Sequence, residues 1–202
     1  MTRWYVEKKR EHYYKQAKKQ GYRARSSYKL KQIQKKYHLI SKGDYVLDLG
    51  AAPGGWSQVA KEFCGVEGKI IGIDLLPIIP IDDVVFLRGD ITEDASIQQI
   101  KDVLDGHLPQ VVLSDMAPNI SGNYSVDHAQ SIYLSMCALN LAKDLLISHG
   151  HFVCKVFMGE SFEELLQMVK ELFQTVYCFS PPASRKSSSE IYIIGKLYNK
   201  EY

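Results

Sequence analysis

Asp44-Tyr-Val-Leu-Asp-Leu-Gly-Ala-Ala-Pro-Gly-Gly-Trp56 is the stretch that decides the fold of this chain. Its apolar first half predicts a buried strand, and Ser57–Phe63, which follows, predicts a helix. The glycines between them predict a tight turn, in which the main chain can approach a ligand closely. The N-terminus of the helix then offers unpaired N–H groups to an anionic or electron-rich ligand.

The spacing of the glycines separates three kinds of ligand site. A P-loop requires a lysine after its last glycine, but Trp56 follows Gly55, so a P-loop is excluded. A dinucleotide-binding turn requires a glycine where this chain has Ala52, which makes NAD the weaker interpretation. The pattern Asp48-x-Gly50-x-x-Pro-Gly54-Gly55 instead resembles the S-adenosylmethionine turn of Rossmann-like methyltransferases. A tight turn without any ligand is the remaining alternative.

Strands and helices alternate along most of the chain. We expect strands at 44–50, 69–75, 84–88, 110–114, 151–157, 175–179 and 191–198, and helices at about 55–64, 95–104, 127–148 and 162–173. This order predicts an α/β Rossmann-like fold with a mainly parallel, doubly wound sheet. A short loop joins the last two strands, which predicts an antiparallel hairpin at the C-terminal edge. We expect one compact domain overall, with residues 1–42 as a basic N-terminal RNA-binding arm and helix and residues 43–202 as the catalytic part.

Length and composition agree with one domain, because 202 residues that are 46% hydrophobic can form a substantial core. The four cysteines are widely separated and lie in apolar stretches, so they predict core thiols in a reducing compartment: Cys64, Cys137, Cys154 and Cys178. No segment has the character of a signal peptide or the length of a membrane span. We therefore expect a soluble cytoplasmic protein without a membrane partner.

The net charge of +2 conceals a strong asymmetry. Residues 1–42 contain 14 Lys or Arg and 2 Glu, a balance of +12, which leaves −10 for residues 43–202. The basic segment also carries aromatic side chains: Trp4, Tyr5, Tyr13, Tyr14, Tyr22, Tyr28 and Tyr37. Basic residues neutralise phosphates and aromatic rings stack on unpaired bases, so this mixture favours RNA as the partner. Residues 1–20 predict a basic helix or a partly disordered arm, and residues 23–37 a helix with Ser26 or Ser27 as its N-cap.

Charged side chains follow or interrupt the predicted strands at the edge where such sheets bind ligands. Asp74 is placed to accept the ribose hydroxyls of a nucleoside, with a turn aspartate as the alternative. Asp90 is placed to accept an adenine amine, with a helix cap as the alternative. Asp115 begins Asp-Met-Ala-Pro, which disfavours an amine as the methyl acceptor. Lys155 lies inside an apolar strand, where an ammonium is costly unless it reaches a polar cavity or a partner.

Four separated motifs occur in order along the chain. They are Tyr22-Arg-Ala-Arg-Ser-Ser-Tyr-Lys29-Leu, Asp48-Leu-Gly-Ala-Ala-Pro-Gly-Gly-Trp56-Ser-Gln, Ser114-Asp-Met-Ala-Pro-Asn, and Lys155-Val-Phe-Met-Gly-Glu followed by Ser184-Arg-Lys-Ser-Ser-Ser-Glu190-Ile-Tyr. Together they strongly resemble the FtsJ/RrmJ family of RNA ribose 2′-O-methyltransferases, over roughly residues 15–198. Met158 stands where bacterial members of the family carry Gln, which leaves the RNA specificity open.

The resemblance implies a set of site residues. The implied catalytic tetrad is Lys29, Asp115, Lys155 and Glu190. The implied cofactor is S-adenosylmethionine, and we expect it to contact Gly50, Ala51, Gly54, Gly55, Trp56, Asp74, Asp90 and Asp115. We expect RNA contacts from Arg23, Arg25, Arg185 and Lys186. No metal is expected, because displacement at a sulfonium carbon leaves a neutral thioether and needs no Lewis acid.

The resemblance also implies the substrate, a uridine ribose in the aminoacyl-tRNA-binding loop of the peptidyl-transferase region of large-subunit ribosomal RNA. A tRNA anticodon-loop enzyme of the same family is the closest alternative. A non-catalytic RNA-binding protein and a small-molecule hydroxyl methyltransferase are alternatives of other classes, and the basic N-terminal segment argues against the latter. We expect a monomer that acts on ribosomal RNA within the large ribosomal subunit.

Methyl transfer to a ribose hydroxyl is an in-line displacement, so alignment of the reacting atoms supplies much of the acceleration. We hypothesise that Lys155 orients the hydroxyl and takes its proton, with Lys29 nearby and with Asp115 and Glu190 fixing the ammonium groups. A second lysine favours release of a proton from Lys155, but two carboxylates oppose it. Both roles, base or orienting group, therefore stay open at this point.

Overall fold

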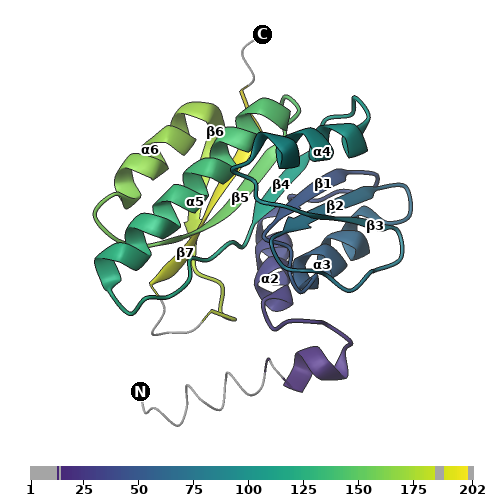
Figure 1. Ribbon diagram of the computed structural model, residues 1–202, viewed down its shortest axis with the longest axis horizontal. Coiled ribbons are helices and arrows are strands. Elements are labelled where there is room, and N and C mark those ends of the chain that lie inside the picture. Colours follow the sequence, from purple (N-terminus) through teal and green to yellow (C-terminus); the bar gives the residue numbers. More distant parts are fainter. Residues whose placement is uncertain (1–12, 14, 185–188, 200–202) are drawn as a thin grey trace.

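The computed structural model describes residues 13, 15–184 and 189–199. The helices run over Ser27–Tyr37 (α2), Gly55–Cys64 (α3), Asp94–Leu104 (α4), Tyr124–Leu145 (α5) and Phe162–Leu172 (α6). The strands run over Tyr45–Leu49 (β1), Lys69–Asp74 (β2), Val84–Arg88 (β3), Val111–Ser114 (β4), His151–Phe157 (β5), Phe173–Phe179 (β6) and Glu190–Tyr198 (β7). Figure 1 shows these elements as one α/β domain around a twisted sheet.

The described strands form one sheet in the order β3-β2-β1-β4-β5-β7-β6. Strands β1 to β5 pair in parallel, and the chain reverses its strand order at the β1–β4 neighbours. Strand β7 lies between β5 and β6 and is antiparallel to both. The predicted Rossmann-like sheet with an antiparallel C-terminal hairpin is therefore confirmed.

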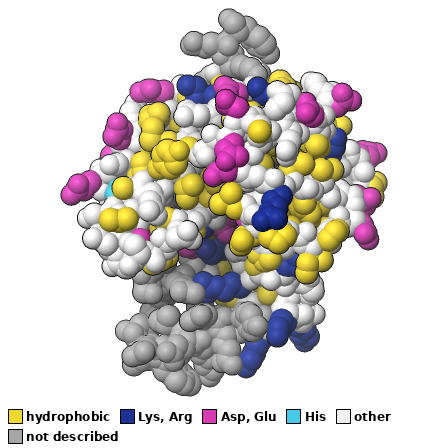
Figure 2. All heavy atoms as spheres, viewed as in Figure 1, with side chains coloured by type: hydrophobic (Ala, Val, Ile, Leu, Met, Phe, Trp, Pro, Cys, Tyr) yellow, Lys and Arg dark blue, Asp and Glu magenta, His cyan; other side chains and the backbone are white. Residues whose placement is uncertain are grey.

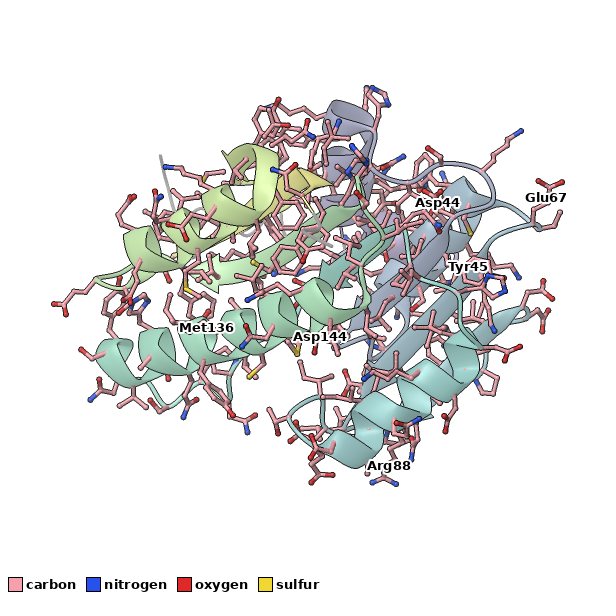
Figure 3. The ribbon with its side chains drawn as sticks, turned by 90° about the horizontal axis from the view of Figure 1, so that it is seen from above. Asp44, Tyr45, Glu67, Arg88, Met136 and Asp144 are labelled. Atoms are coloured by element: carbon pink, nitrogen blue, oxygen red, sulfur yellow. The ribbon has the colours of Figure 1, made fainter. Side chains whose placement is uncertain are left out.

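Alternating side chains of each central strand enter different cores. On β1, Leu47 belongs to the core under α4, α5 and α6, whereas Val46 belongs to the core under α2 and α3. Ile71 and Ile70 on β2 divide in the same way. In Figure 3, Met136 marks α5 on one side of the sheet. The sheet is thus covered on both faces, which explains why its strands read as continuous apolar runs.

The helix α2 is part of the second core, although it belongs to the basic N-terminal segment. Leu30 and Ile33 are fully buried in it, beside α3. Ser26 is the N-cap residue, as one of the two predicted alternatives, but its side chain makes no capping hydrogen bond. The Ser27 hydroxyl donates to the Gly55 carbonyl at 3.0 Å. Residues 1–12 and 14 lie outside the described residues, so the predicted basic arm is not described for most of its length.

Helix α5 begins and ends about one turn earlier than the expected 127–148. Asn123 sets its start, because the Asn123 side chain accepts from the N–H groups of Ser125 and Val126. The loop before it is fixed by Asp127, whose carboxylate accepts from the main-chain N–H and hydroxyl of Ser121, both at 2.7 Å. These local polar contacts outweighed the apolar pattern on which the expected range rested.

Candidate active site

The turn between β1 and α3 lies at the carboxyl end of the central strand. Gly50 and Gly54 have φ values of +73° and +102°, a conformation that other residues disfavour. A Cβ on Gly50 would lie 2.5 Å from Met116 Cγ, so the turn packs directly on the loop after β4. The N–H groups of Gly50 and Ala51 donate to the Ile73 carbonyl at 2.9 and 3.1 Å. The turn thus joins the ends of β1, β2 and β4 beside the N-terminus of α3.

Two acidic side chains expected to hold the cofactor also organise their own loops. Asp74 accepts from the N–H groups of Ala52 and Leu76, both at 2.9 Å, and so links the glycine turn to the loop after β2. Asp90 Oδ1 accepts from the N–H and the hydroxyl of Thr92 at 2.9 and 2.8 Å. A carboxylate has about four lone-pair sites, so these contacts leave room for ligand hydroxyl or amine groups.

Asp48 is a buried carboxyl group beneath the same turn and is fully shielded from solvent. The Ser57 hydroxyl of α3 donates to Asp48 Oδ2 at 2.6 Å, whereas Oδ1 has no hydrogen-bond partner in the described part of the chain. Burial raises the pKa of Asp48 to about 7, and the nearby Asp115 and Asp74 carboxylates add to this shift. The Ser57 hydrogen bond opposes it.

Lys155 and Asp115 form an ion pair at the carboxyl ends of β5 and β4. The register Ser114 with Cys154 sets the next residues of the two strands side by side. Lys155 Nζ lies 2.9 Å from Asp115 Oδ1 and also donates to the Asp115 main-chain carbonyl. The lysine side chain is only 7% exposed, so the carboxylate is the partner that offsets the cost of burying the ammonium.

Lys29 and Glu190 form the second ion pair of the site. Lys29 Nζ, on α2, lies 2.5 Å from Glu190 Oε1 at the start of β7. The side chains are 7% and 13% exposed. In the register of β5 and β7, Glu190 faces Phe157 and Tyr192 faces Lys155, so the second pair lies beside the first. The structure thus brings together all four residues of the predicted tetrad.

Tyr192 connects the two pairs, and the sequence analysis did not identify it. Its hydroxyl donates to Asp115 Oδ1 at 2.7 Å, and Lys29 Nζ lies 5.6 Å from the centre of its ring. The ring stacks on Trp56 of α3 at a centroid distance of 5.7 Å. Trp56 is itself buried, and its indole N–H donates to the Ser26 carbonyl at 2.9 Å. A tyrosine hydroxyl inside the apolar run of β7 was the signal that a polar partner must be present.

The charges of the site favour ionised carboxylates and a neutral tyrosine. Burial pushes the pKa of Asp115 upward, but the Lys155 and Lys29 ammonium groups hold it below its ordinary value, helped by the Tyr192 hydroxyl. Burial likewise opposes ionisation of Glu190, yet Lys29 lowers the pKa of Glu190 overall. Burial and the two carboxylates raise the pKa of Tyr192 well above its ordinary value. The carboxyl groups of Asp115 and Glu190 are therefore ionised at neutral pH, and the Tyr192 hydroxyl remains a hydrogen-bond donor.

The four arginine and lysine residues expected to contact RNA differ in position. Arg23 is engaged within the chain: its guanidinium donates to the carbonyls of Pro53, at 3.2 Å, Pro80, at 2.7 Å, and Ile79. It thereby clamps the glycine turn to the loop after β2. Arg25 is close enough to Tyr192 for its charge to act on the phenol. Arg185 and Lys186 lie outside the described residues.

The surface drawn in Figure 2 has an uneven charge distribution. Its Lys and Arg side chains lie mainly in the lower half, around a hollow, whereas Asp and Glu side chains lie mainly around the upper half and the sides. Within the described ranges, no group of three or more His, Cys, Asp or Glu side chains is arranged to hold a metal ion. In the same part of the chain, no helix is both long enough and apolar enough to cross a bilayer.

The residues around the glycine turn fit S-adenosylmethionine. The positive-φ glycines let the main chain approach the ligand closely. Carboxylates at the ends of β2, after β3 and after β4 can accept from ribose hydroxyls, an adenine amine and an ammonium group. The unpaired Oδ1 of Asp48 adds a buried acceptor under the turn. No lysine or arginine follows the glycines to meet phosphates, which agrees with a ligand that has none.

Comparisons with known proteins agree with this geometry. The sequence model of the family described as FtsJ-like methyltransferase matches residues 22–198. The chain is 53% identical over 187 residues to a ribosomal RNA large subunit methyltransferase E of Methanothrix thermoacetophila, covering 93% of this chain and 72% of that protein. It is 46% identical over 200 residues to the protein of the same name from Methanocaldococcus jannaschii, covering 97% and 82%.

A solved structure shares the fold. It is described as a ribosomal RNA methyltransferase of Plasmodium falciparum and superposes with a TM-score of 0.81 at 30% sequence identity. The superposition covers 89% of this chain and all of that one. The likeness thus includes the central sheet and the helices on both of its faces.

Proposed function

Because the chain belongs to the FtsJ-like methyltransferase family, we propose that it transfers a methyl group from S-adenosylmethionine to a ribose 2′-hydroxyl of large-subunit ribosomal RNA. The observation that carries this proposal is the pairing of Lys155 with Asp115 and of Lys29 with Glu190 beside the glycine turn. Two paired lysines offer directed N–H donors to an oxygen nucleophile. This arrangement supports a hydroxyl as the methyl acceptor.

Each candidate cofactor residue has a role that its position supports. Asp74 would hold the ribose hydroxyls, and Asp90 the adenine amine, of the cofactor. The main chain at Gly50, Ala51, Gly54 and Gly55 would line the methionine part, and the carboxylate of Asp115 would face its ammonium. Trp56 is buried and stacks on Tyr192, so it would support the cofactor site from beneath the glycine turn. S-adenosylmethionine supplies the methyl group on a sulfonium and leaves as a neutral thioether.

We propose that Lys155 orients the attacking 2′-hydroxyl and stabilises the negative charge that develops on its oxygen. Two contacts from Lys155 go to Asp115, which leaves the ammonium one N–H donor for the substrate. A lysine whose N–H groups already donate to a carboxylate and a carbonyl is held in place to direct a further N–H at a hydroxyl, which supports orientation over proton abstraction. Lys29 would hold the neighbouring nucleotide atoms while Glu190 fixes its direction. The hydroxyl proton is released to water as the new C–O bond forms.

Lys155→Arg distinguishes the two roles. An arginine stays protonated at all relevant pH values, so retained turnover would contradict a base role and support orientation. Lys155→Ala should abolish turnover while cofactor affinity stays within about twofold of the wild type.

The substrate assignment rests on the relatives named above and on the basic surface. We propose a uridine in the aminoacyl-tRNA-binding loop of the peptidyl-transferase region, within the large subunit, and a monomeric enzyme. We propose that RNA phosphates contact Arg25, Arg185 and Lys186. Arg23 would act on RNA indirectly, through the glycine turn and the loop after β2 that it holds together. A tRNA anticodon-loop ribose remains the alternative substrate, because the same tetrad would serve it.

Methyl transfer from labelled S-adenosylmethionine to separate pools tests the proposal. The pools are large ribosomal subunits, protein-free ribosomal RNA and tRNA, with Lys155→Ala as the matched control. We expect label in a ribosomal pool that disappears with the variant. Label only in tRNA would overturn the substrate, and no label in any pool, despite cofactor binding, would favour a non-catalytic RNA-binding protein.

A further inference from the structure

Tyr124 is an exposed aromatic side chain at the rim of the active site. It begins α5, nine residues after Asp115, and 61% of it is open to solvent. Beside it lies Met158, which is 42% exposed and follows Lys155 by three residues. Three extended residues span about 10 Å, so the two side chains lie within one or two nucleotides of the proposed reacting hydroxyl. The proposed mechanism gives no role to either.

The ring of Tyr124 is held in place although it is exposed. Its hydroxyl donates to the Met158 carbonyl, and the Met158 N–H donates to the carbonyl of Ser189 at 2.9 Å. Ser189 precedes the tetrad residue Glu190, so one continuous set of contacts joins the ring to the catalytic pairs. The position of the ring is thereby coupled to the geometry of the site.

One face of the Tyr124 ring is also supported from within the fold. It lies on the His128 ring at a centroid distance of 6.3 Å and an interplanar angle of 11°. His128 is buried and uses both ring nitrogens: Nδ1 donates to the Phe157 carbonyl at 3.1 Å, and Nε2 accepts from the Ser161 N–H at 3.2 Å. The tyrosine is therefore oriented by its hydroxyl and by one face, and its exposed surface is presented to solvent.

We propose that Tyr124 is a stacking platform for an unpaired base of the RNA substrate, the reacting nucleotide or its neighbour. This inference rests on the proposed function. A fixed, exposed ring beside the proposed site of methyl transfer suits a nucleobase, because base stacking needs an accessible aromatic face. Stacking would hold the base while Lys155 orients the ribose hydroxyl, so Tyr124 contributes to the choice of nucleotide.

Four substitutions at this position separate stacking from other contacts. Tyr124→Phe and Tyr124→Trp keep an aromatic face, whereas Tyr124→Leu keeps only apolar bulk and Tyr124→Ala removes both. Tyr133→Ala is the matched control, because Tyr133 is 58% exposed on the same helix and lies about 13 Å further along its axis. The readouts are the KM and the equilibrium Kd for the RNA that the wild type methylates, with cofactor affinity as the check on folding.

We expect Tyr124→Ala and Tyr124→Leu to raise the KM and Kd for RNA about tenfold or more, at unchanged cofactor affinity. The aromatic variants and Tyr133→Ala should stay within about threefold of the wild type. The salt dependence of RNA binding should keep its slope, because no phosphate contact is lost.

Several results would overturn the platform. Wild-type values in Tyr124→Ala would exclude any contact with RNA. Wild-type KM and Kd values in Tyr124→Leu would indicate that the side chain packs on an apolar surface, such as that of a ribosomal protein, instead of stacking on a base. A wild-type chain that binds ribosomal RNA without methylating it would refute the proposed function, and the Kd ratios would still decide the platform.

Discussion

Replacement of Asp48 by asparagine should change how the stability of the protein depends on pH. Asp48 is fully buried and has a pKa of about 7 in the folded chain, against about 3.9 for a free aspartate. Between these values the unfolded chain has released the proton and the folded chain still holds it, so rising pH favours unfolding. Below about pH 4 the group has no effect. Three pKa units at about 1.4 kcal/mol each remove about 4 kcal/mol of stability by pH 7, and the loss then stays constant.

Asp48→Asn removes this titration while keeping an acceptor for the Ser57 hydroxyl. Its amide adds a buried N–H₂ near the position of the unpaired Oδ1, at a cost of about 1–3 kcal/mol that does not depend on pH. The free energy of unfolding of the variant relative to the wild type should therefore rise by about 3 kcal/mol from pH 5 to pH 7 and then level off. The prediction concerns this change of the free-energy difference with pH, and not the constant cost of the buried amide.

Urea unfolding of the cofactor-free protein at pH 5, 6, 7 and 8 measures this difference. The exposed Asp102 provides the control, because Asp102→Asn makes the same chemical change outside the core. A flat difference for Asp48→Asn would mean that the buried carboxyl has the same proton affinity in the folded and the unfolded chain, which would contradict the raised pKa of Asp48.

The remaining predictions concern the two ion pairs and the clamp on the glycine turn. Tyr192→Phe deletes the hydrogen bond to Asp115 and keeps the stacked ring, so kcat should fall about tenfold with little change in cofactor affinity; unchanged steady-state kinetics would contradict this role. Glu190→Gln leaves the buried ammonium of Lys29 unpaired and should cost about 3 kcal/mol of stability at pH 7 in chemical denaturation; the cost should shrink towards acid pH, because the lowered pKa of Glu190 stabilises the fold only while the carboxyl is ionised. Arg23→Ala releases the loop after β2 and should weaken binding of S-adenosylhomocysteine about tenfold in calorimetry; an unchanged Kd for that ligand with a smaller salt slope for RNA would instead assign Arg23 to phosphate contact.

The class of the sheet and the burial of both its faces could be predicted because they rest on long apolar runs and on the alternation of strands with helices. The run around Val46 and Leu47 on β1 is buried from both sides, and such runs are typical of parallel sheets. The ends of the elements were less predictable. The start of α5 depends on the cap by Asn123, and the length of β6 depends on pairing with β7, so neither is fixed by local periodicity.

The charged members of the site could be predicted because a buried lysine or an acid at a strand end demands an explanation. The four tetrad residues come from four distant segments, and family resemblance, not spacing, grouped them. Tyr192 was missed since a tyrosine in an apolar run passes for a core residue until its hydroxyl is seen to reach Asp115. Arg23 was expected to contact RNA, and only the fold reveals that its guanidinium donates to main-chain carbonyls of the chain itself.

The proposed 2′-hydroxyl acceptor is tested by locating the transferred methyl group on the RNA. Large-subunit RNA methylated by the wild-type chain with labelled S-adenosylmethionine would be hydrolysed in alkali and the products analysed by mass spectrometry. A 2′-O-methyl group blocks cleavage of the adjoining phosphodiester, so we expect label in an alkali-resistant dinucleotide that begins with uridine. Label in a mononucleotide that carries a methylated base would contradict the account, because paired lysines would then have served a different acceptor.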